Sequence, residues 1–183
     1  MWNRITVLDS YPDPGDRPAA AVLAPLFEDE DGYVRVVLTK RPDTMPTHAG
    51  HIAFPGGRPD PGDTGPVGTA LREAHEEVGI EPNRVEVLGF LEPIDTVEFS
   101  PVVIPVVGRV RTPFALVPDE REVDKIYTPL LSDLADASRW WSVPWADWEV
   151  WYYLLDGDTL WGATARMVRL LVGLDAPGSS MRR

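Results

Sequence analysis

A glycine pair followed by a glutamate-rich helix constrains this chain more than any other feature. Gly56 and Gly57 lie in a turn-rich segment, and residues 72–79 read Arg-Glu-Ala-His-Glu-Glu-Val-Gly. An ideal helix turns about 100° per residue, so the three glutamates of this run fall within about 100° of arc. Apolar residues gather on another side, namely Val67, Ala70, Leu71, Ala74 and Val78. The pattern predicts a helix that packs by one face and presents carboxylates on another.

Three neighbouring carboxylates provide the oxygen ligands that hard divalent cations prefer. Mg²⁺ commonly binds a few protein carboxylates together with waters and substrate phosphates. Glycines before the helix let the backbone approach a phosphate or a metal closely. The alternative is a solvated acidic helix face with Arg72 as its charge partner, which describes most Glu-rich helix surfaces. The turn-rich segment 54–63 that leads into the helix favours the metal site.

These residues resemble the signature box of the Nudix hydrolases, which cleave nucleoside diphosphates linked to another moiety. The matching positions are Gly57, Asp63, Arg72-Glu73-Ala74, Glu76-Glu77 and Gly79-Ile80. Asp63 and Arg72 are nine positions apart, which makes the loop one residue longer than in the usual box. The resemblance implies an α+β fold of the Nudix type, an α/β/α sandwich with a mixed β-sheet clasped between helices.

Further segments resemble the coenzyme A pyrophosphatase branch of that family, which carries the same longer loop. They are 38–41, 48–50, 54–57, 122–126 with 129–130, and 161–165, and the whole resemblance spans roughly residues 19 to 172. It implies hydrolysis of coenzyme A or its derivatives to 4'-phosphopantetheine and adenosine 3',5'-bisphosphate. Pro42 and Pro46 depart from the branch pattern and change both the charge and the shape of their loop. ADP-ribose, a dinucleotide or another nucleoside diphosphate derivative is therefore an alternative substrate, and a non-catalytic nucleotide-binding module is a further alternative.

The resemblance also implies catalytic roles for residues of the helix and of a later loop. The implied ligands of Mg²⁺ or Mn²⁺ are Glu73, Glu76, Glu77 and the Gly57 backbone. Arg72 is expected to orient the glutamates by salt bridges. The general base is either a helix glutamate or Glu122, while Glu120 is interpreted as a solvated loop charge. Metals acidify bound water and neutralise phosphoryl charge, so little covalent work falls to the protein.

Four basic residues are candidates for binding the substrate: Lys40, Arg41, His48 and Arg58. The alternative for the first three is a basic strand end with a polar turn. The chain has a formal net charge of −12, so local bases and bound cations would have to reverse the field at a site for a polyanion. The same charge argues against a nucleic-acid surface. A small-molecule nucleoside diphosphate, with coenzyme A favoured, is the expected partner.

Composition predicts one domain without disulfides. The 183 residues suffice for a single core, and the chain has no cysteine, so any metal is held mainly by oxygen. No apolar run has the length of a membrane span and the N-terminus lacks a secretory apolar segment, which predicts a cytoplasmic protein without membrane contact. Residues 1–18 are rich in proline and are expected to form an irregular arm, with a single Nudix hydrolase domain over 19–183.

Strand and helix signals fill that domain. Strands are expected over 19–27, 33–39, 85–91, 102–110 and 149–155, the first two as a hairpin around the acidic turn 28–32, and a last helix over 163–174. Tryptophans crowd the C-terminal third, and alternation through Trp148, Val150, Tyr152 and Leu154 suits a half-buried strand. Core packing is the favoured interpretation of these aromatic residues, with a stacking platform for a base as the alternative. Exposed Val and Trp side chains leave a homodimer possible.

Overall fold

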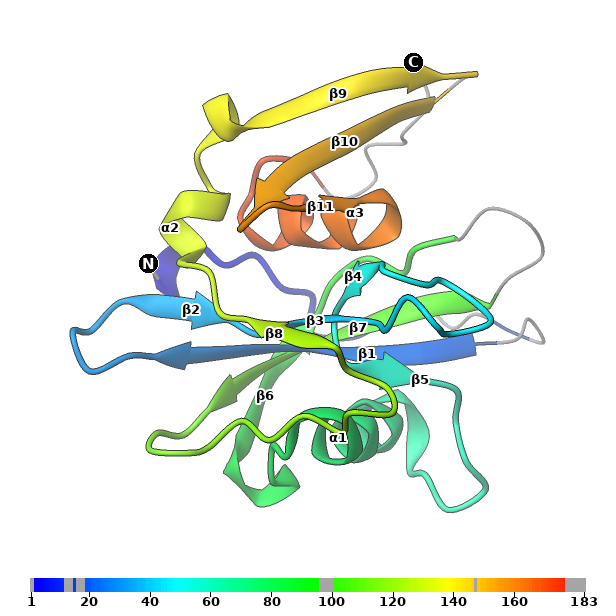
Figure 1. The fold of residues 1–183 in the computed structure, drawn as a ribbon. Coiled ribbons are helices and arrows are strands. Elements are labelled where there is room, and N and C mark those ends of the chain that lie inside the picture. The colour runs from blue at the N-terminus through cyan, green and yellow to red at the C-terminus, as the bar shows by residue number, and fades with distance from the viewer. Residues whose placement is uncertain (1, 12–14, 16–18, 96–100, 147, 177–183) are drawn as a thin grey trace.

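The chain folds around a mixed sheet that lies between two helices, as Figure 1 shows. The computed structural model describes residues 2–11, 15, 19–95, 101–146 and 148–176. Its strands are β1 (Ala19–Glu28), β2 (Val34–Val36), β3 (Leu38–Lys40), β4 (Ile52–Ala53), β5 (Gly56–Gly57), β6 (Val85–Phe90), β7 (Val102–Val110), β8 (Lys125–Tyr127), β9 (Trp140–Trp145), β10 (Trp148–Leu155) and β11 (Asp158–Trp161). Its helices are α1 (Gly65–Val78), α2 (Leu131–Leu134) and α3 (Gly162–Leu171), and 3-10 turns span Trp2–Arg4, Pro82–Arg84 and Ala137–Arg139.

The described strands form three sheets. In the largest, the order is β2-β1-β7-β6, with β5 paired to β1. Strands β1 and β7 run parallel, whereas β2, β5 and β6 pair antiparallel with their neighbours, which makes the sheet mixed. Two smaller antiparallel sheets have the orders β4-β3-β8 and β11-β10-β9. The predicted α+β fold with a mixed sheet between helices is confirmed.

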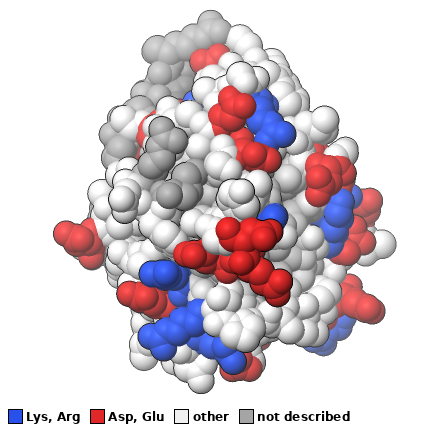
Figure 2. All heavy atoms as spheres, turned by 90° about the vertical axis from the view of Figure 1, so that its left-hand side faces the viewer, with Lys and Arg blue, Asp and Glu red and all other residues white. Residues whose placement is uncertain are grey.

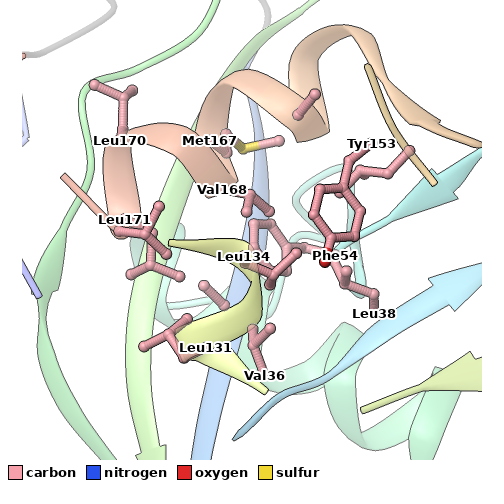
Figure 3. Close-up of a cluster of buried hydrophobic side chains, with 14 of the residues drawn as sticks. Val36, Leu38, Phe54, Leu131, Leu134, Tyr153, Met167, Val168, Leu170 and Leu171 are labelled. Atoms are coloured by element: carbon pink, nitrogen blue, oxygen red, sulfur yellow. The ribbon is translucent and has the colours of Figure 1, made fainter. Parts of the chain in front are cut away.

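Alternation along β1 divides the core into two layers. Successive side chains of a strand point to opposite faces. Ala21 and Leu23 therefore join the cluster that α1 covers with Ala70, Ala74 and Val78, and Ala24 and Leu26 join the other cluster. Figure 3 shows that second cluster, in which Met167, Val168 and Leu171 of α3 meet Leu131 and Leu134 of α2 and strand residues such as Val36 and Leu38. Both faces of the central sheet are thus closed by apolar packing.

Helix α1 begins and ends where its sequence directs. Pro66 occupies the first turn, where its missing N–H removes no helical hydrogen bond. Gly79 ends the helix with φ of 72°, a left-handed conformation that glycine adopts without a Cβ penalty. The amide of Gly79 donates to the carbonyl of His75, and that of Ile80 donates to the carbonyl of Ala74. Ile80 is buried, so the chain turns sharply and returns to the core. The predicted helix and its packing face are confirmed.

Most of the predicted strands exist, but several short elements were not anticipated. The hairpin around residues 28–32 is confirmed, with Phe27 opposite Arg35. The predicted strand 33–39 is interrupted, since β2 pairs with β1 and β3 pairs with β4 and β8 in another sheet. The last helix ends at Leu171, earlier than predicted. Strands of two to six residues escaped prediction, namely β4, β5, β8, β9 and β11, as did the four-residue helix α2.

The described part of the N-terminal segment packs on the main sheet. Trp2 lies in a 3-10 turn, and its indole N–H donates to Glu28 at 3.1 Å. Leu8 and Phe90 exchange backbone hydrogen bonds of 2.7 and 2.9 Å. Residues 12–14 and 16–18 of the predicted arm lie outside the described residues. The division into an arm over 1–18 and a domain over 19–183 stays a prediction.

The aromatic strand β10 faces the opposite way from the prediction. Tyr153 and Leu155 are buried against the core, whereas Leu154 is 61% exposed. The prediction of core packing is confirmed for Trp140, which is 6% exposed and donates from its indole nitrogen to the carbonyl of Leu134. The same prediction is wrong for three other tryptophans, which are exposed: Trp141, Trp145 and Trp161. The reason is that α3 packs against the Tyr153 side of the sheet. On the other side, the His51 ring contacts the Trp161 ring at 4.9 Å, and Trp141, Trp145 and Trp161 stay exposed.

Charge on the surface follows the acidic composition. On the face shown in Figure 2, acidic side chains are more extensive than basic ones, and most basic side chains lie beside acidic ones. Examples of such pairing are Arg35 with Asp29 at 2.7 Å and Arg139 with Asp133 at 2.8 Å. None of the described helices is long and apolar enough to cross a membrane.

Candidate active site

Of the three helix glutamates, Glu77 is buried and Glu73 is largely covered, so the acidic face of α1 is not a fully solvated surface. The side chain of Glu73 is 15% exposed and Glu77 is 5% exposed as a residue, while the side chain of Glu76 is 55% exposed. Burial arises because β5 pairs with β1 beside the helix. The Gly56 amide points to Oε1 of Glu77 at a long 3.5 Å. The simpler interpretation of a solvated acidic face is wrong for Glu73 and Glu77.

Arg72 is the centre of the ion-pair network at this site. Its Nε donates to Oδ1 of Asp63 at 3.0 Å, and its Nη2 donates to Oδ2 of Asp63 at 3.1 Å. It also pairs with Glu73 at 3.0 Å and with Glu76 at 2.8 Å. Its Nη2 donates in addition to the carbonyl of Arg58 at 2.9 Å. A planar guanidinium with five fixed donors suits this arrangement, in which one side chain ties the loop before the helix to two of its glutamates.

Asp63 holds the other end of that network. It accepts from the Thr69 hydroxyl at 2.9 Å and from the Asp60 amide at 2.8 Å, in addition to Arg72. The Arg72 guanidinium, helped by these donors, lowers the pKa of Asp63 to about 2. The carboxylate therefore fixes the longer loop against the first turns of α1.

We expect Asp63→Asn to lower stability at neutral pH and to flatten its acid dependence. A carboxyl whose folded pKa is depressed contributes stability that is present above its unfolded value, near 4, and is lost as the pH falls toward about 2. The difference in melting temperature between wild type and variant should thus be largest at pH 6 and should close between about pH 4 and about pH 2. Asp31→Asn, at an exposed turn position, is the control. A difference that stays constant across this range would contradict the assignment.

Burial and nearby carboxylates both disfavour a charge on Glu77. Burial raises the pKa of Glu77 to about 8, and the nearby charges of Glu73 and Glu122 contribute in the same direction, while the Gly56 amide and Arg41 oppose them. Burial likewise raises the pKa of Glu73, with Glu76 and Glu122 adding to the effect and Arg72 opposing it. Glu122 is exposed on a loop from elsewhere in the sequence, yet its charge acts on both buried glutamates. Glu122 therefore lies close enough for its charge to act on Glu73 and Glu77.

The glycine pair fits tightly between β1 and α1. A Cβ at Gly57 would lie 2.7 Å from Cδ of Glu73 and would overlap its Oε1. A Cβ at Gly56 would lie 2.5 Å from Cα of Val22 on β1. Neither glycine has a positive φ, so their need is for close approach and not for a special backbone conformation.

This donor set fits a hard divalent cation. Among the described residues, no three acidic or histidine side chains are already arranged to hold a metal ion, and Arg72 engages oxygens of Glu73 and Glu76. Buried carboxylates that repel one another are nevertheless unfavourable unless a positive charge joins them. The Glu73 carboxylate lies directly against the Gly57 backbone, and carboxylate and backbone oxygens are the ligands that such cations prefer. The roles of Glu73, Glu76, Glu77 and Gly57 as metal ligands stay predictions.

Arg41 is the predicted basic residue whose charge acts on buried Glu77. It lowers the pKa of Glu77 and also contributes to the lowered pKa of His51, for which burial is the main cause. Its Nε is buried without a hydrogen-bond partner in the described part of the chain, and its Nη2 approaches Sδ of Met45 at 3.6 Å. The loop it begins is closed by the Arg41 amide to the His51 carbonyl at 3.0 Å and the Gly50 amide to the Arg41 carbonyl at 3.2 Å. Arg41 thus joins the 41–51 loop to the acidic site.

Lys40 is held by a partner that the sequence did not suggest. Its Nζ pairs with Oδ1 of Asp158 at 2.9 Å, and Asp158 also accepts from the Tyr127 hydroxyl and approaches Lys125 at 3.7 Å. The Asp158 hydrogen bond raises the pKa of Lys40, and the Tyr127 and Lys40 hydrogen bonds lower the pKa of Asp158. Lys40 and Asp158 are 118 residues apart, so no local signal indicated the pair. Much of the Lys40 charge is therefore neutralised within the protein.

The two remaining predicted substrate residues lie at the surface. His48 is exposed, has a φ of 54° and lies with its ring 5.4 Å from that of His51. The ring of His51 in turn contacts that of Trp161 at 4.9 Å. Arg58 is exposed, and its backbone carbonyl accepts from Arg72. The Nε of Arg41 is thus buried and its charge acts on Glu77, whereas His48 and Arg58 are exposed, and the roles of all three in binding stay predictions.

Comparison with known proteins identifies the family of this chain. The profile of the NUDIX domain matches residues 17–152. Nudix hydrolase 22 of Arabidopsis thaliana, a chloroplastic protein, is 39% identical over 161 residues, which cover 81% of this chain and 52% of that protein. The uncharacterized Nudix hydrolase NudL of Enterobacter sp. (strain 638) is 37% identical over 166 residues, covering 85% of this chain and 82% of that protein. The chain spans about half the length of the Arabidopsis relatives it matches.

A solved structure supports the same fold. The MutT/nudix family protein from Enterococcus faecalis has a TM-score of 0.57 and 17% identity, with 87% of this chain and 62% of that chain covered. At this identity the likeness concerns the fold alone. The profile and the sequence relatives carry the assignment further, because they cover most of this chain at more than a third identity. On these grounds the chain belongs to the Nudix hydrolase family.

Proposed function

We propose that this chain is a metal-dependent pyrophosphohydrolase that cleaves coenzyme A or its derivatives to 4'-phosphopantetheine and adenosine 3',5'-bisphosphate. The observation that carries the hydrolase proposal is the position of Glu73 against the Gly57 backbone, next to buried Glu77, with the charge of Glu122 acting on both glutamates. Family membership supports it. The coenzyme A assignment rests on the resemblance of segments 38–41, 48–50 and 54–57 to the coenzyme A pyrophosphatase branch.

We propose separate roles in hydrolysis for the residues of the site. Glu73, Glu76 and Glu77 with the Gly57 backbone would hold Mg²⁺ or Mn²⁺, which when bound supplies charge neutralisation for the pyrophosphate and acidifies water. Arg72 positions Glu73 and Glu76 through its ion pairs and does not need to touch the substrate. Glu122 is proposed as the general base that takes the proton of the attacking water. The water oxygen then bonds to phosphorus while the bridging oxygen leaves with its electron pair.

Arg41 is proposed to bind a phosphate oxygen of the substrate. Its buried Nε lacks a partner in the described residues, and an anion would satisfy that donor. Lys40 is not proposed to contact the substrate, because its Nζ already pairs with Asp158 at 2.9 Å. His48 and Arg58 lie farther out and are proposed to contact the remoter parts of the substrate.

We expect Mg²⁺- or Mn²⁺-dependent hydrolysis of coenzyme A to exceed that of ADP-ribose and NADH. Products are resolved chromatographically, and the Glu77→Gln variant shows which turnover belongs to this site. Coenzyme A cleavage that is lost in the variant supports the proposal. Preference for ADP-ribose or NADH would keep the hydrolase but change its substrate. No turnover of any of the three, with binding retained, would favour a nucleotide-binding module.

A further inference from the structure

The outer face of the β9-β10-β11 sheet carries no charged side chain among the described residues. Strand register places eight uncharged described residues on this face: Trp141, Val143, Trp145, Val150, Tyr152, Leu154, Thr159 and Trp161. We call this set the outer aromatic face. In Figure 1, β9 and β10 lie on the far side of α3 from the central sheet. Charged residues make up 25% of the whole chain, so an uncharged face of this size is unusual for it.

The centre of the outer aromatic face is a row of stacked rings. Tyr152 is paired with Trp141 on one side and with Trp161 on the other. The Trp141 and Tyr152 rings lie 5.8 Å apart at 15°, and the Tyr152 and Trp161 rings lie 6.3 Å apart at 13°. The rings support one another across the strands, so little side-chain entropy remains to be lost on contact. The result is a flat and rigid apolar platform.

The exposure of this platform is substantial. The exposed fractions are 45% for Trp141, 47% for Val143, 66% for Trp145, 61% for Leu154 and 38% for Trp161. Large aromatic side chains bury about 150–250 Å² each when fully covered. A face with three partly exposed tryptophans therefore offers several hundred Å², which is the order of the roughly 800 Å² per partner in a stable interface.

We propose that the outer aromatic face is the interface through which two copies of this chain form a two-fold dimer. A two-fold axis brings the same patch of both copies together, so the patch must be complementary to itself. In a chain of net charge −12, a charge-free face can meet itself without opposing like charges. The same net charge disfavours contact with an anionic membrane surface.

Pro144 favours face-to-face contact over pairing of strand edges. It lies in β9 opposite Glu149 of β10, and β9 has no second strand neighbour among the described elements. Proline has no N–H, so the free edge of β9 lacks a donor in its middle and is a poor template for another strand. Stacking of the two outer aromatic faces closes the assembly at two copies.

The test is the mass of the full chain in solution from about 1 to about 100 µM, measured by sedimentation velocity. We expect the wild type to reach twice its 20.3 kDa. Val143→Glu places like charges across the axis and should weaken association by at least about 100-fold. Trp145→Ser, at a more exposed position, should weaken it by about 10-fold or more. Far-UV circular dichroism shows that each variant is folded, and Trp145→Ser keeps the test decisive if Val143→Glu does not fold.

Tyr33→Glu is the matched control, since Tyr33 is 57% exposed on the β1–β2 hairpin and lies far along the chain from this sheet. Its dimer should persist. A wild type that stays monomeric throughout would overturn the proposal, as would a dimer that both Val143→Glu and Trp145→Ser leave intact. A dimer lost equally in Tyr33→Glu would also overturn it.

Discussion

Glu77→Gln is expected to lower turnover by at least about 100-fold and, without metal, to make the protein more stable at pH 8 than the wild type. Changing the groups that merely orient a metal ligand costs about 10–100-fold, so the loss of a ligand should exceed that range. The stability gain follows from burial, because Glu77 is 5% exposed and its pKa is raised to about 8. Glutamine keeps the shape and removes the charge.

The stability difference between Glu77→Gln and the wild type should grow as the pH rises. A group whose folded pKa is raised contributes stability that is fully present below its unfolded pKa, near 4.5, and is lost as the pH rises to about 8. A pKa that differs by one between the folded and unfolded states corresponds to about 1.4 kcal/mol. The variant and the wild type should therefore be similar near pH 4.5, and the variant should be more stable by a few kcal/mol, as an order of magnitude, at pH 8. Urea unfolding in the presence of a chelator measures this difference.

Adding Mg²⁺ tests whether Glu77 binds metal separately from its effect on stability without metal. Mg²⁺ should raise the melting temperature of the wild type at pH 8, because a ligand that binds only the folded state stabilises it, and should do so much less in Glu77→Gln. Glu86→Gln, at an exposed position of β6, is the control and should behave as wild type throughout. A stability difference that does not vary with pH would show that Glu77 is not the titrating group.

The helix and its glycine turn were predictable because their signals are local. The apolar positions of α1 recur at helical spacing, and Gly79 supplies the left-handed end. The burial of Glu77 was not predictable, because it depends on the pairing of β5 with β1, which is a contact between distant segments. The Lys40–Asp158 pair was not predictable either, because its members are 118 residues apart.

The orientation of β10 depends on more than its own sequence. Alternation gives the period of a strand but not which of its two faces is buried when both are apolar. Val150, Tyr152 and Leu154 form one apolar set, and Trp151, Tyr153 and Leu155 form the other. Packing of α3 buries the second set, which exposes Leu154 and its neighbours. The outer aromatic face is a consequence of that packing.

Gly57→Ala is expected to raise the Mg²⁺ concentration for half-maximal activity by at least about 10-fold while the protein remains folded. The added methyl group would lie 2.7 Å from Cδ of Glu73, so the Glu73 carboxylate or the backbone must move. Gly62→Ala, in the loop that follows β5, is the matched control, because its Cβ would meet nothing within 4 Å and Gly62 also lacks a positive φ. It should keep wild-type metal dependence. Gly56→Ala would press on the β1 backbone at Val22 and should instead lower the melting temperature. If Gly57→Ala kept the metal dependence of wild type, the Gly57 backbone and Glu73 would not form part of the metal site, and the catalytic proposal would need a different set of ligands.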